Sequence, residues 1–239
     1  MVDTFHQQQN VTPPPRIPPL RVPPLESGDR LTRHEFERRY EAMPNLKKAE
    51  LIEGVVYVPA ALRFRSHGQP HGDLITWLGV YRTFTPKVAL GDNPTVRLDR
   101  DNEPQPDAVL LIEESAGGQA RLSQDDYVEG APELIAEVAA SSASIDLGDK
   151  KRVYRRNGVQ EYIVWQVFEH KIDWFRLKDD EYVLLPIEEG IVRSEVFPGL
   201  WLDASALLNS DMPQVLAVLQ QGIDSEEHQQ FVQKLAQKH

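Results

Sequence analysis

Apolar and polar positions alternate along this chain in patterns that predict both helices and strands. Apolar residues recur at helical spacing over 71–84, which predicts a helix there. Short apolar runs, several of them rich in β-branched residues, predict strands at 51–58, 95–98, 108–112 and 134–140. The polar stretch 121–130 is expected to be a loop.

The two ends of the chain differ in pattern. The stretch "TPPPRIPPLRVPP" carries seven prolines between Pro13 and Pro24, so residues 1–28 are expected to form an extended tail with few contacts to the folded part. Thr32, with Glu35 three residues later, predicts a capped helix start. At the other end, Asp211 predicts an N-cap, and two helices are expected to close the chain.

The central segment combines strand, turn and helix within a short span. A Ser-rich turn follows the strand 134–140, a helix is predicted from Asp146 to Gly158, and four strand-like runs at hairpin spacing come next. This order favours an α+β fold with an α/β-type core, in which helices flank a mixed β-sheet. We expect a tail (1–28), a main domain (29–205) and a C-terminal helical extension (206–239).

Composition narrows the classes of function. The 239 residues carry a net charge of −11, which argues against non-specific coating of nucleic acid but leaves room for a local basic groove. There is no cysteine, which excludes disulfides and thiolate sites. Because no apolar run approaches the roughly 20 residues that cross a bilayer, and no signal-peptide core is visible, a cytoplasmic location is expected.

Two of the predicted strands carry a carboxylate. Asp107 opens the strand 108–112, Glu137 lies inside the next apolar strand, and Lys150 lies on the helix that follows. A buried charge is costly unless it is paired or binds a metal, so Glu137 needs a partner. Two carboxylates at one end of a sheet suit Mg²⁺, which is bound with waters and phosphate oxygens, and an ammonium group can neutralise charge on phosphate.

Each of these residues also fits a purely structural role. Asp107 fits a turn at the strand entry, Glu137 fits pairing with a buried arginine, and Lys150 fits a solvated basic face.

The helix after Glu137 is basic within an acidic chain. Residues 146–160 hold two acids and five bases, a local charge of +3. A basic patch beside carboxylates favours a phosphodiester substrate, with Lys151, Arg152 and Arg155 as contacts to the DNA backbone. An ordinary charged helix face would show the same pattern.

The stretches "PQPDAVLLI" and "PELIAEVAASSASIDLGDKKRVYRRNGVQEYIVW" resemble the Uma-two family of predicted endonucleases, within the PD-(D/E)XK or restriction-endonuclease-like superfamily. The resemblance extends to "AELIEGVVYVPA", "HGDLITWL" and "FPGLWLD", and so spans 49–203. It implies a restriction-endonuclease-like fold and DNA cleavage dependent on Mg²⁺ or Mn²⁺. By the same resemblance Asp107 and Glu137 bind the metal and Lys150 assists catalysis.

One departure from the superfamily signature concerns the lysine. The pattern (D/E)-x-K places lysine at position 139, where this chain has Ala139. In the family the lysine lies on the next helix, in D-x-x-x-K, and this helix offers both Lys150 and Lys151. We choose Lys150 because Tyr154, an accessory candidate, follows it by four residues on the same helix face.

Three further residues match the family less specifically. Asp146 lies at the expected helix start and also fits an N-cap. Glu50 resembles an additional acidic residue near the metal, and it also fits a charge at a strand edge. His71 is expected to cap a helix or to line the groove. Together with His67 it has zinc-like spacing, but the glutamate of a zinc helix motif is absent.

Three functions follow from these observations. The first is a metal-dependent endonuclease that hydrolyses DNA, the second a nucleic-acid-binding protein of the same fold without efficient cleavage, and the third a protein–protein interaction module that uses the proline-rich tail. The intact set Asp107, Glu137 and Lys150 favours the first. DNA is then the expected substrate and Mg²⁺ or Mn²⁺ the cofactor, with no membrane partner; a homodimer is left open.

Overall fold

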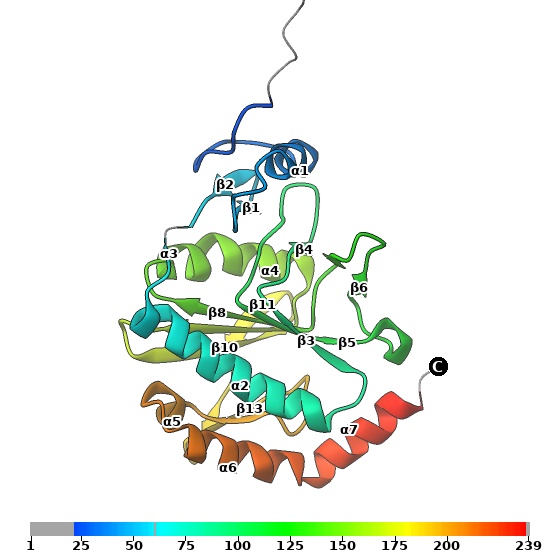
Figure 1. Cartoon of the computed structure of the whole chain (residues 1–239). Coiled ribbons are helices and arrows are strands. Elements are labelled where there is room, and N and C mark those ends of the chain that lie inside the picture. The colour runs from blue at the N-terminus through cyan, green and yellow to red at the C-terminus, as the bar shows by residue number, and fades with distance from the viewer. Residues whose placement is uncertain (1–21, 60, 238–239) are drawn as a thin grey trace, which may run out of the picture.

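A six-stranded mixed sheet forms the centre of the computed structural model, which describes residues 22–59 and 61–237 (Figure 1). The strand order is β11-β10-β9-β8-β5-β3, with β8 and β9 parallel and the other neighbours antiparallel. The strands are β3 (Val88–Asp92), β5 (Ala108–Ile112), β8 (Leu134–Ala139), β9 (Glu161–Gln166), β10 (Lys171–Lys178) and β11 (Glu181–Leu184). The mixed sheet expected from the sequence is confirmed.

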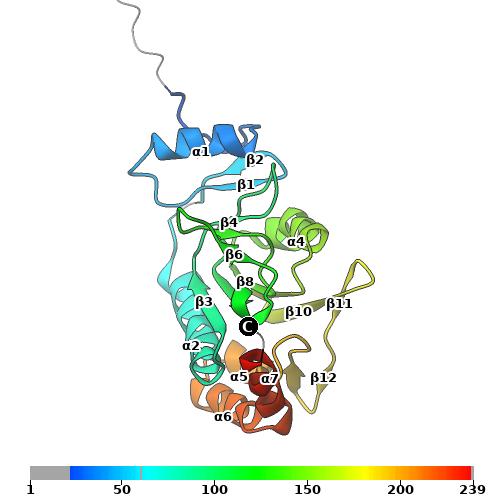
Figure 2. The same ribbon diagram turned by 90° about the vertical axis from the view of Figure 1, so that its right-hand side faces the viewer.

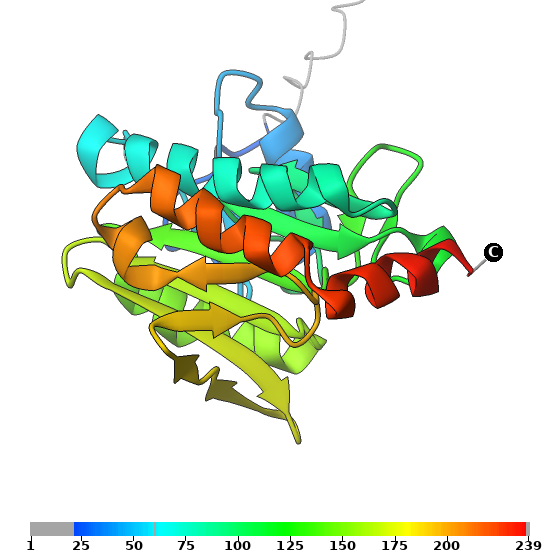
Figure 3. The ribbon, with the colours of Figure 1, turned by 90° about the horizontal axis from the view of Figure 1, so that it is seen from below.

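Helices cover both faces of this sheet. The helix α2 (Gln69–Phe84) lies on one face, and α6 (Met212–Ile223) packs beside it, as Figure 3 shows from below. On the other face lies a nearly continuous helix made of α3 (Ala143–Ile145), the π-helical turn η3 (Asp146–Lys150) and α4 (Lys151–Asn157). Successive strand side chains alternate between the two faces, so that Leu110 packs in the α2 core and Val109 in the α4 core.

A small N-terminal layer lies beyond α4 (Figure 2). It consists of α1 (Arg33–Glu41) and the hairpin β1 (Glu50–Ile52) and β2 (Val55–Tyr57) around a core of its own. The single strand expected over 51–58 is therefore wrong. Glu53 and Gly54 both have positive φ, 51° and 73°, which is the backbone of a tight hairpin turn.

Part of the expected tail belongs to this layer. Leu25 is 5% exposed and packs in the same core as Phe36 and Leu51, and the Gly28 amide donates to the Val56 carbonyl at 2.8 Å. The expectation of few contacts is wrong for residues 22–28, because an apolar side chain after the prolines finds a buried position. Residues 1–21 lie outside the described part of the chain.

Shorter elements complete the fold. A three-stranded sheet joins β4 (Val96–Arg97), β7 (Val128–Glu129) and β6 (Arg121–Leu122), so the expected loop 121–130 contains two short strands. A second one joins β12 (Ile187–Glu188), β13 (Ile191–Arg193) and β14 (Trp201–Asp203); the turn η2 spans Glu114–Ala116.

The C-terminal helices follow the expected pattern. After α5 (Ala204–Leu208), the Asp211 side chain caps α6 by accepting the Gln214 amide, and α7 (Glu226–Ala236) ends the described chain. These helices share the hydrophobic core of α2, so the segment 206–237 packs onto the main domain. Every helix within 22–59 and 61–237 is too short or too polar to cross a membrane.

The cap expected near Thr32 is absent. Thr32 does precede α1, but its side chain makes no capping hydrogen bond, and Glu35 instead accepts from Arg38 and Arg39. Arginines on the next turn thus compete with the backbone for the carboxylate.

Candidate active site

The register between β5 and β8 places Asp107 opposite Glu137. Ala108 pairs with Ala136 in this antiparallel ladder, and one step further along the same register lie Asp107 and Glu137. Opposite residues of an antiparallel pair project to the same face. The Oδ2 atom of Asp107 also accepts the Val138 amide at 2.8 Å, which ties the start of β5 to β8. The expectation that the two acidic strands are neighbours is confirmed.

The face that carries Glu137 is the one covered by α4. Ile135 and Ala139, two residues before and after Glu137, pack in the α4 core. A lysine at position 139 would lie on this same face, so Ala139 leaves room for a lysine that descends from the helix. Lys150 reaches Glu137 from the π-helical turn η3, and such turns are frequent at functional sites.

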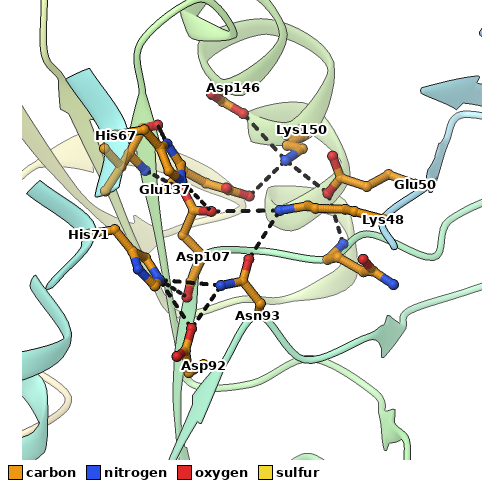
Figure 4. Close-up of polar contacts among 12 residues, drawn as sticks. Lys48, Glu50, His67, His71, Asp92, Asn93, Asp107, Glu137, Asp146 and Lys150 are labelled. Atoms are coloured by element: carbon orange, nitrogen blue, oxygen red, sulfur yellow. Dashed lines mark hydrogen bonds and ion pairs between the residues drawn. The ribbon is translucent and has the colours of Figure 1, made fainter. Parts of the chain in front are cut away.

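Lys150 lies among three carboxylates (Figure 4). Its Nζ atom is 2.9 Å from Glu137 Oε1, 3.0 Å from Glu50 Oε1 and 3.4 Å from Asp146 Oδ1. Its side chain is only 5% exposed. The alternative of a solvated basic face is therefore wrong for Lys150, and the charge of Glu137 is paired with a lysine rather than with an arginine.

Tyr154 holds the same carboxylate from one turn further along the helix. Its hydroxyl donates to Glu137 Oε1 at 2.9 Å, so that this oxygen receives both Tyr154 and Lys150. Among the hydrogen bonds of the described residues, none reaches Glu137 Oε2. The helix therefore fixes the Glu137 carboxylate through Oε1 and leaves Oε2 available to a further ligand.

Burial dominates the electrostatics of this cluster. Burial raises the pKa of Glu137 to about 8; Lys150 opposes this rise, while Asp146, Asp107 and Glu50 add to it. The three acids around Lys150 keep its pKa well above the usual value, although burial alone would lower it. The ammonium group therefore stays charged, while the carboxylates compete for its single positive charge.

Asp146 and Glu50 enter the cluster from different parts of the chain. Asp146 lies inside the continuous helix, which starts at Ala143, so its alternative role as an N-cap is wrong. Its Oδ1 atom is buried and has no hydrogen-bond partner in the described part of the chain. Glu50 comes from β1 and accepts the Gln105 amide at 2.8 Å, which makes it a buried residue rather than an exposed strand-edge charge.

A second lysine reaches the site from the N-terminal layer. Lys48 Nζ lies 3.6 Å from Asp107 Oδ1 and 3.3 Å from Asn93 Oδ1, and its side chain is 23% exposed. Nothing in the local pattern of "NLKKAE" distinguishes Lys48 from its neighbour Lys47. Its position two residues before Glu50, on the segment that enters β1, is the only local signal.

The two histidines have different surroundings. His67 Nε2 is 3.5 Å from Asp107 Oδ1, and His67 lines a pocket that Asp107 and Glu137 also line. His71 Nε2 instead lies 3.1 Å from Asp92 Oδ1 and 3.2 Å from the Asp107 carbonyl, so it contacts the backbone behind the carboxylate. Of the two histidines, His67 lines the pocket, and His71, which was expected to line the groove, does not.

The basic residues after Lys150 point elsewhere. Lys151 Nζ lies 3.6 Å above the ring of Phe175, Arg152 pairs with Glu53 and Asp149, and Arg155 pairs with Glu181. None of these three residues lines the pocket that holds Asp107 and Glu137. Their contact with a DNA backbone stays a prediction from the sequence.

The cluster opens into a pocket of about 440 Å³. Its acidic part contains Glu50, Asp107, Glu137 and Asp146, and its basic part contains Lys48, Arg63 and Lys150. The arrangement concentrates carboxylate oxygens and ammonium groups in one cleft, which suits chemistry on a phosphate group.

Comparison with known proteins identifies the family of this chain. A sequence profile of the family Uma2, described as "Putative restriction endonuclease", matches residues 33–205. The chain belongs to the Uma2 family. The matched region of this Uma2 chain contains all the carboxylates and both lysines of the pocket, and the resemblance seen in the sequence motifs is confirmed.

A solved structure supports the fold of the Uma2 chain. The crystal structure of a protein from Anabaena variabilis, titled a "putative nuclease belonging to DUF820", superposes with a TM-score of 0.54. The two chains are 13% identical, and the match covers 72% of this chain and 97% of the other. A comparison with curated protein sequences finds no match.

Proposed function

We propose that this Uma2 protein is a metal-dependent endonuclease that hydrolyses DNA phosphodiester bonds. The observation that supports this most directly is the register of β5 and β8, which sets Asp107 and Glu137 opposite each other at one pocket. Membership of a family whose description reads "Putative restriction endonuclease" points the same way.

The oxygens at the pocket fit a hard divalent cation. Asp107 Oδ1 makes only contacts of 3.5 Å or more, to His67 and Lys48, and Glu137 Oε2 receives no hydrogen bond from the described residues. Asp146 Oδ1 is buried, receives no hydrogen bond from the described residues and shares Lys150 with Glu137 and Glu50, so the acids outnumber the cations that pair with them. No set of three or more acidic, histidine or cysteine side chains is arranged for a metal within 22–59 and 61–237. Mg²⁺ typically needs only one or two carboxylates, together with waters and phosphate oxygens.

The chain's own residues then have distinct tasks. Asp107 and Glu137 would hold Mg²⁺ or Mn²⁺, which when bound supplies Lewis acidity and lowers the pKa of water. Lys150 and Tyr154 hold Glu137 through Oε1, which leaves Oε2 without a hydrogen bond from the described residues. Lys48, the more exposed lysine, would contact a phosphate oxygen whose negative charge grows during the attack of water.

The decisive experiment measures metal binding and cleavage on the same proteins. Millimolar Mg²⁺ or Mn²⁺ is expected to raise the melting temperature of the wild type by roughly 3–6 °C if the free metal is about ten times Kd. Asp107→Ala and Glu137→Gln should each abolish this rise and the cleavage of plasmid and single-stranded DNA.

A matched control separates the site from general stability. Glu161 is also a buried glutamate, but its oxygens accept from Ser194, Trp174 and two backbone amides. Glu161→Gln should lower the melting temperature while leaving the metal-dependent rise intact. A wild type that binds DNA without cleaving it in Mg²⁺ or Mn²⁺ would favour the non-catalytic alternative.

A further inference from the structure

The mouth of the active-site pocket carries large apolar side chains that are exposed to solvent. Phe168 in the β9–β10 turn is 67% exposed, and Leu62 in the segment before α2 is 65% exposed. Both line the same pocket as Asp107 and Glu137. In Figure 1 the turn and the segment lie at the same end of the sheet. Two large, exposed apolar side chains that line the same pocket suit contact with an apolar part of a ligand.

The pocket is therefore divided chemically. One part of its lining holds the carboxylates and Lys150. Lys48 and Arg63 add positive charge, and Leu62 and Phe168 provide an apolar wall. Arg63 forms no ion pair with any of the described residues and so is available to an anion. Inorganic phosphate would contact only the polar part of the pocket. The apolar wall needs a ligand in which a flat apolar group is attached to a phosphate.

A nucleobase attached to the scissile phosphate has this composition. The pocket volume of about 440 Å³ lies within the roughly 300–1,000 Å³ typical of small-molecule sites. In a continuous duplex both faces of a base are covered by its neighbours, so a phenylalanine ring can stack only on a base that has left the stack. An unstacked base comes either from a single strand or from a nucleotide that rotates out of a duplex.

We propose that Phe168, with Leu62, forms a subsite that stacks on an unstacked nucleobase next to the phosphate bound by the carboxylate site. The inference rests on the proposed nuclease function and adds its substrate class: single-stranded DNA, or duplex DNA with an extruded nucleotide. Stacking on an aromatic ring tolerates any base, so little sequence preference is expected at this nucleotide.

The test compares an oligonucleotide with bases to one without them. Fluorescence anisotropy would measure the affinity of labelled dT12 and of a fully abasic 12-mer at low salt in Mg²⁺, with phosphorothioate linkages in both strands to suppress cleavage. The wild type should bind dT12 about 5- to 100-fold more tightly than the abasic strand, the range of base–aromatic stacking. Phe168→Ala should lose most of this ratio through weaker binding of dT12, with binding of the abasic strand unchanged.

The control is a phenylalanine of similar exposure far from the pocket. Phe84 is 49% exposed and is the last residue of α2, fifteen residues after Gln69, which corresponds to about 22 Å along the helix. Phe84→Ala should keep the wild-type ratio. Equal weakening of both strands by Phe168→Ala, or an unchanged ratio, would overturn the base subsite.

Two further measurements identify the source of the base and separate the two proposals. A duplex containing 2-aminopurine should brighten on binding if the nucleotide is extruded; no brightening together with tight binding of dT12 assigns the subsite to single strands. A wild type that cleaves DNA but binds dT12 and the abasic strand equally refutes the subsite alone. A wild type that neither binds nor cleaves DNA refutes both proposals.

Discussion

A single buried carboxylate, Glu137, organises the candidate site. Its cost of burial is offset in this structure by Lys150 and Tyr154, both on the helix that follows the strand. Four acids compete for Lys48 and Lys150. The contribution of each charged residue to stability therefore depends on its ion-pair partners. The same competition leaves oxygens free for a cation.

Removal of Lys150 is expected to destabilise the fold strongly. Lys150→Met leaves Glu137, Glu50 and Asp146 buried without their cation, which should cost about 3–5 kcal/mol at pH 7. The cost should shrink at pH 5, because burial raises the pKa of Glu137 and of Asp146, and both carboxyl groups are more fully protonated there. Urea unfolding at the two pH values measures this. Lys151→Met, on the next residue, should cost about 1 kcal/mol or less through its contact with Phe175. Equal losses for both variants would contradict the assignment.

Lys48 offers a test of catalysis that leaves stability intact. Lys48→Ala should lower the rate of DNA cleavage roughly 10²-fold, the usual effect of losing one group that stabilises transition-state charge. The metal-dependent rise in melting temperature should persist, since an ammonium group is not a metal ligand. Lys47→Ala changes an exposed neighbour and should have no such effect. Similar rates for the two variants would show that Lys48 does not act on the substrate.

At the scale of elements, one helix and one strand pair set the geometry. The continuous helix 143–157 passes through the π-helical turn that carries Asp146 and Lys150, and it stops at Gly158 with φ of 84°. The backbone amide of Gly158 donates to the carbonyls of Arg155 and Tyr154. A glycine at this end lets the chain turn directly into β9, the parallel neighbour of β8.

Two glycines of this helix should respond oppositely to alanine. Gly158→Ala places a Cβ atom on a left-handed backbone and should lower the free energy of unfolding by about 1–2 kcal/mol. Gly148→Ala should raise it by up to about 1 kcal/mol, because the site has helical backbone and open space for a Cβ atom. Thermal or urea unfolding measures both. A destabilising Gly148→Ala would indicate that the π-helical turn needs the freedom of glycine.

At the scale of the whole molecule, the site lies where the N-terminal layer meets the sheet. Lys48 and Glu50 come from that layer, and Asp107 and Glu137 come from the sheet. The same junction buries Glu103, 3% exposed, beside Glu37 of α1. The hydrogen bonds between the backbones of Leu51 and Glu103 join the two parts. The distances between these site residues therefore depend on how firmly the N-terminal layer is joined to the sheet.

The junction should give the protein a pH-dependent stability. Burial, and then the neighbouring Glu37, raises the pKa of Glu103 from 4.5 to about 8. The folded state holds this proton more tightly than the unfolded state. The resulting stability is complete below about pH 4.5 and is lost as the pH rises through about 8. Glu103→Gln should thus change little at pH 5 but stabilise the protein at pH 8.5, on the order of 1–3 kcal/mol.

Chemical unfolding at the two pH values checks this expectation. Glu129→Gln, which alters the surface ion pair with Arg121, provides the control and should change stability by less than about 1 kcal/mol at either pH. A loss of stability for Glu103→Gln at pH 8.5 would mean that the ion pairs with Arg97 and Arg33 outweigh burial.

The sequence by itself determined which strands are buried and which of them carry acids. The apolar runs around Asp107 and Glu137 are local patterns, and so is the four-residue spacing of Lys150 and Tyr154. Strand β3 and the β1–β2 hairpin escaped prediction. A short strand with an irregular pattern, and a turn whose positive φ falls on Glu53 and Gly54, carry weak local signals.

Only the tertiary structure decided which charges meet. Lys47 and Lys48 are equivalent in the sequence, yet only Lys48 lies near Asp107, because the chain enters β1 with that side chain directed to the sheet. Conversely, Arg152 and Arg155 look available in the sequence but pair with carboxylates distant along the chain. Periodicity arises from the backbone within one element, whereas the partner of a charged side chain depends on how separate elements cross, which no local pattern encodes.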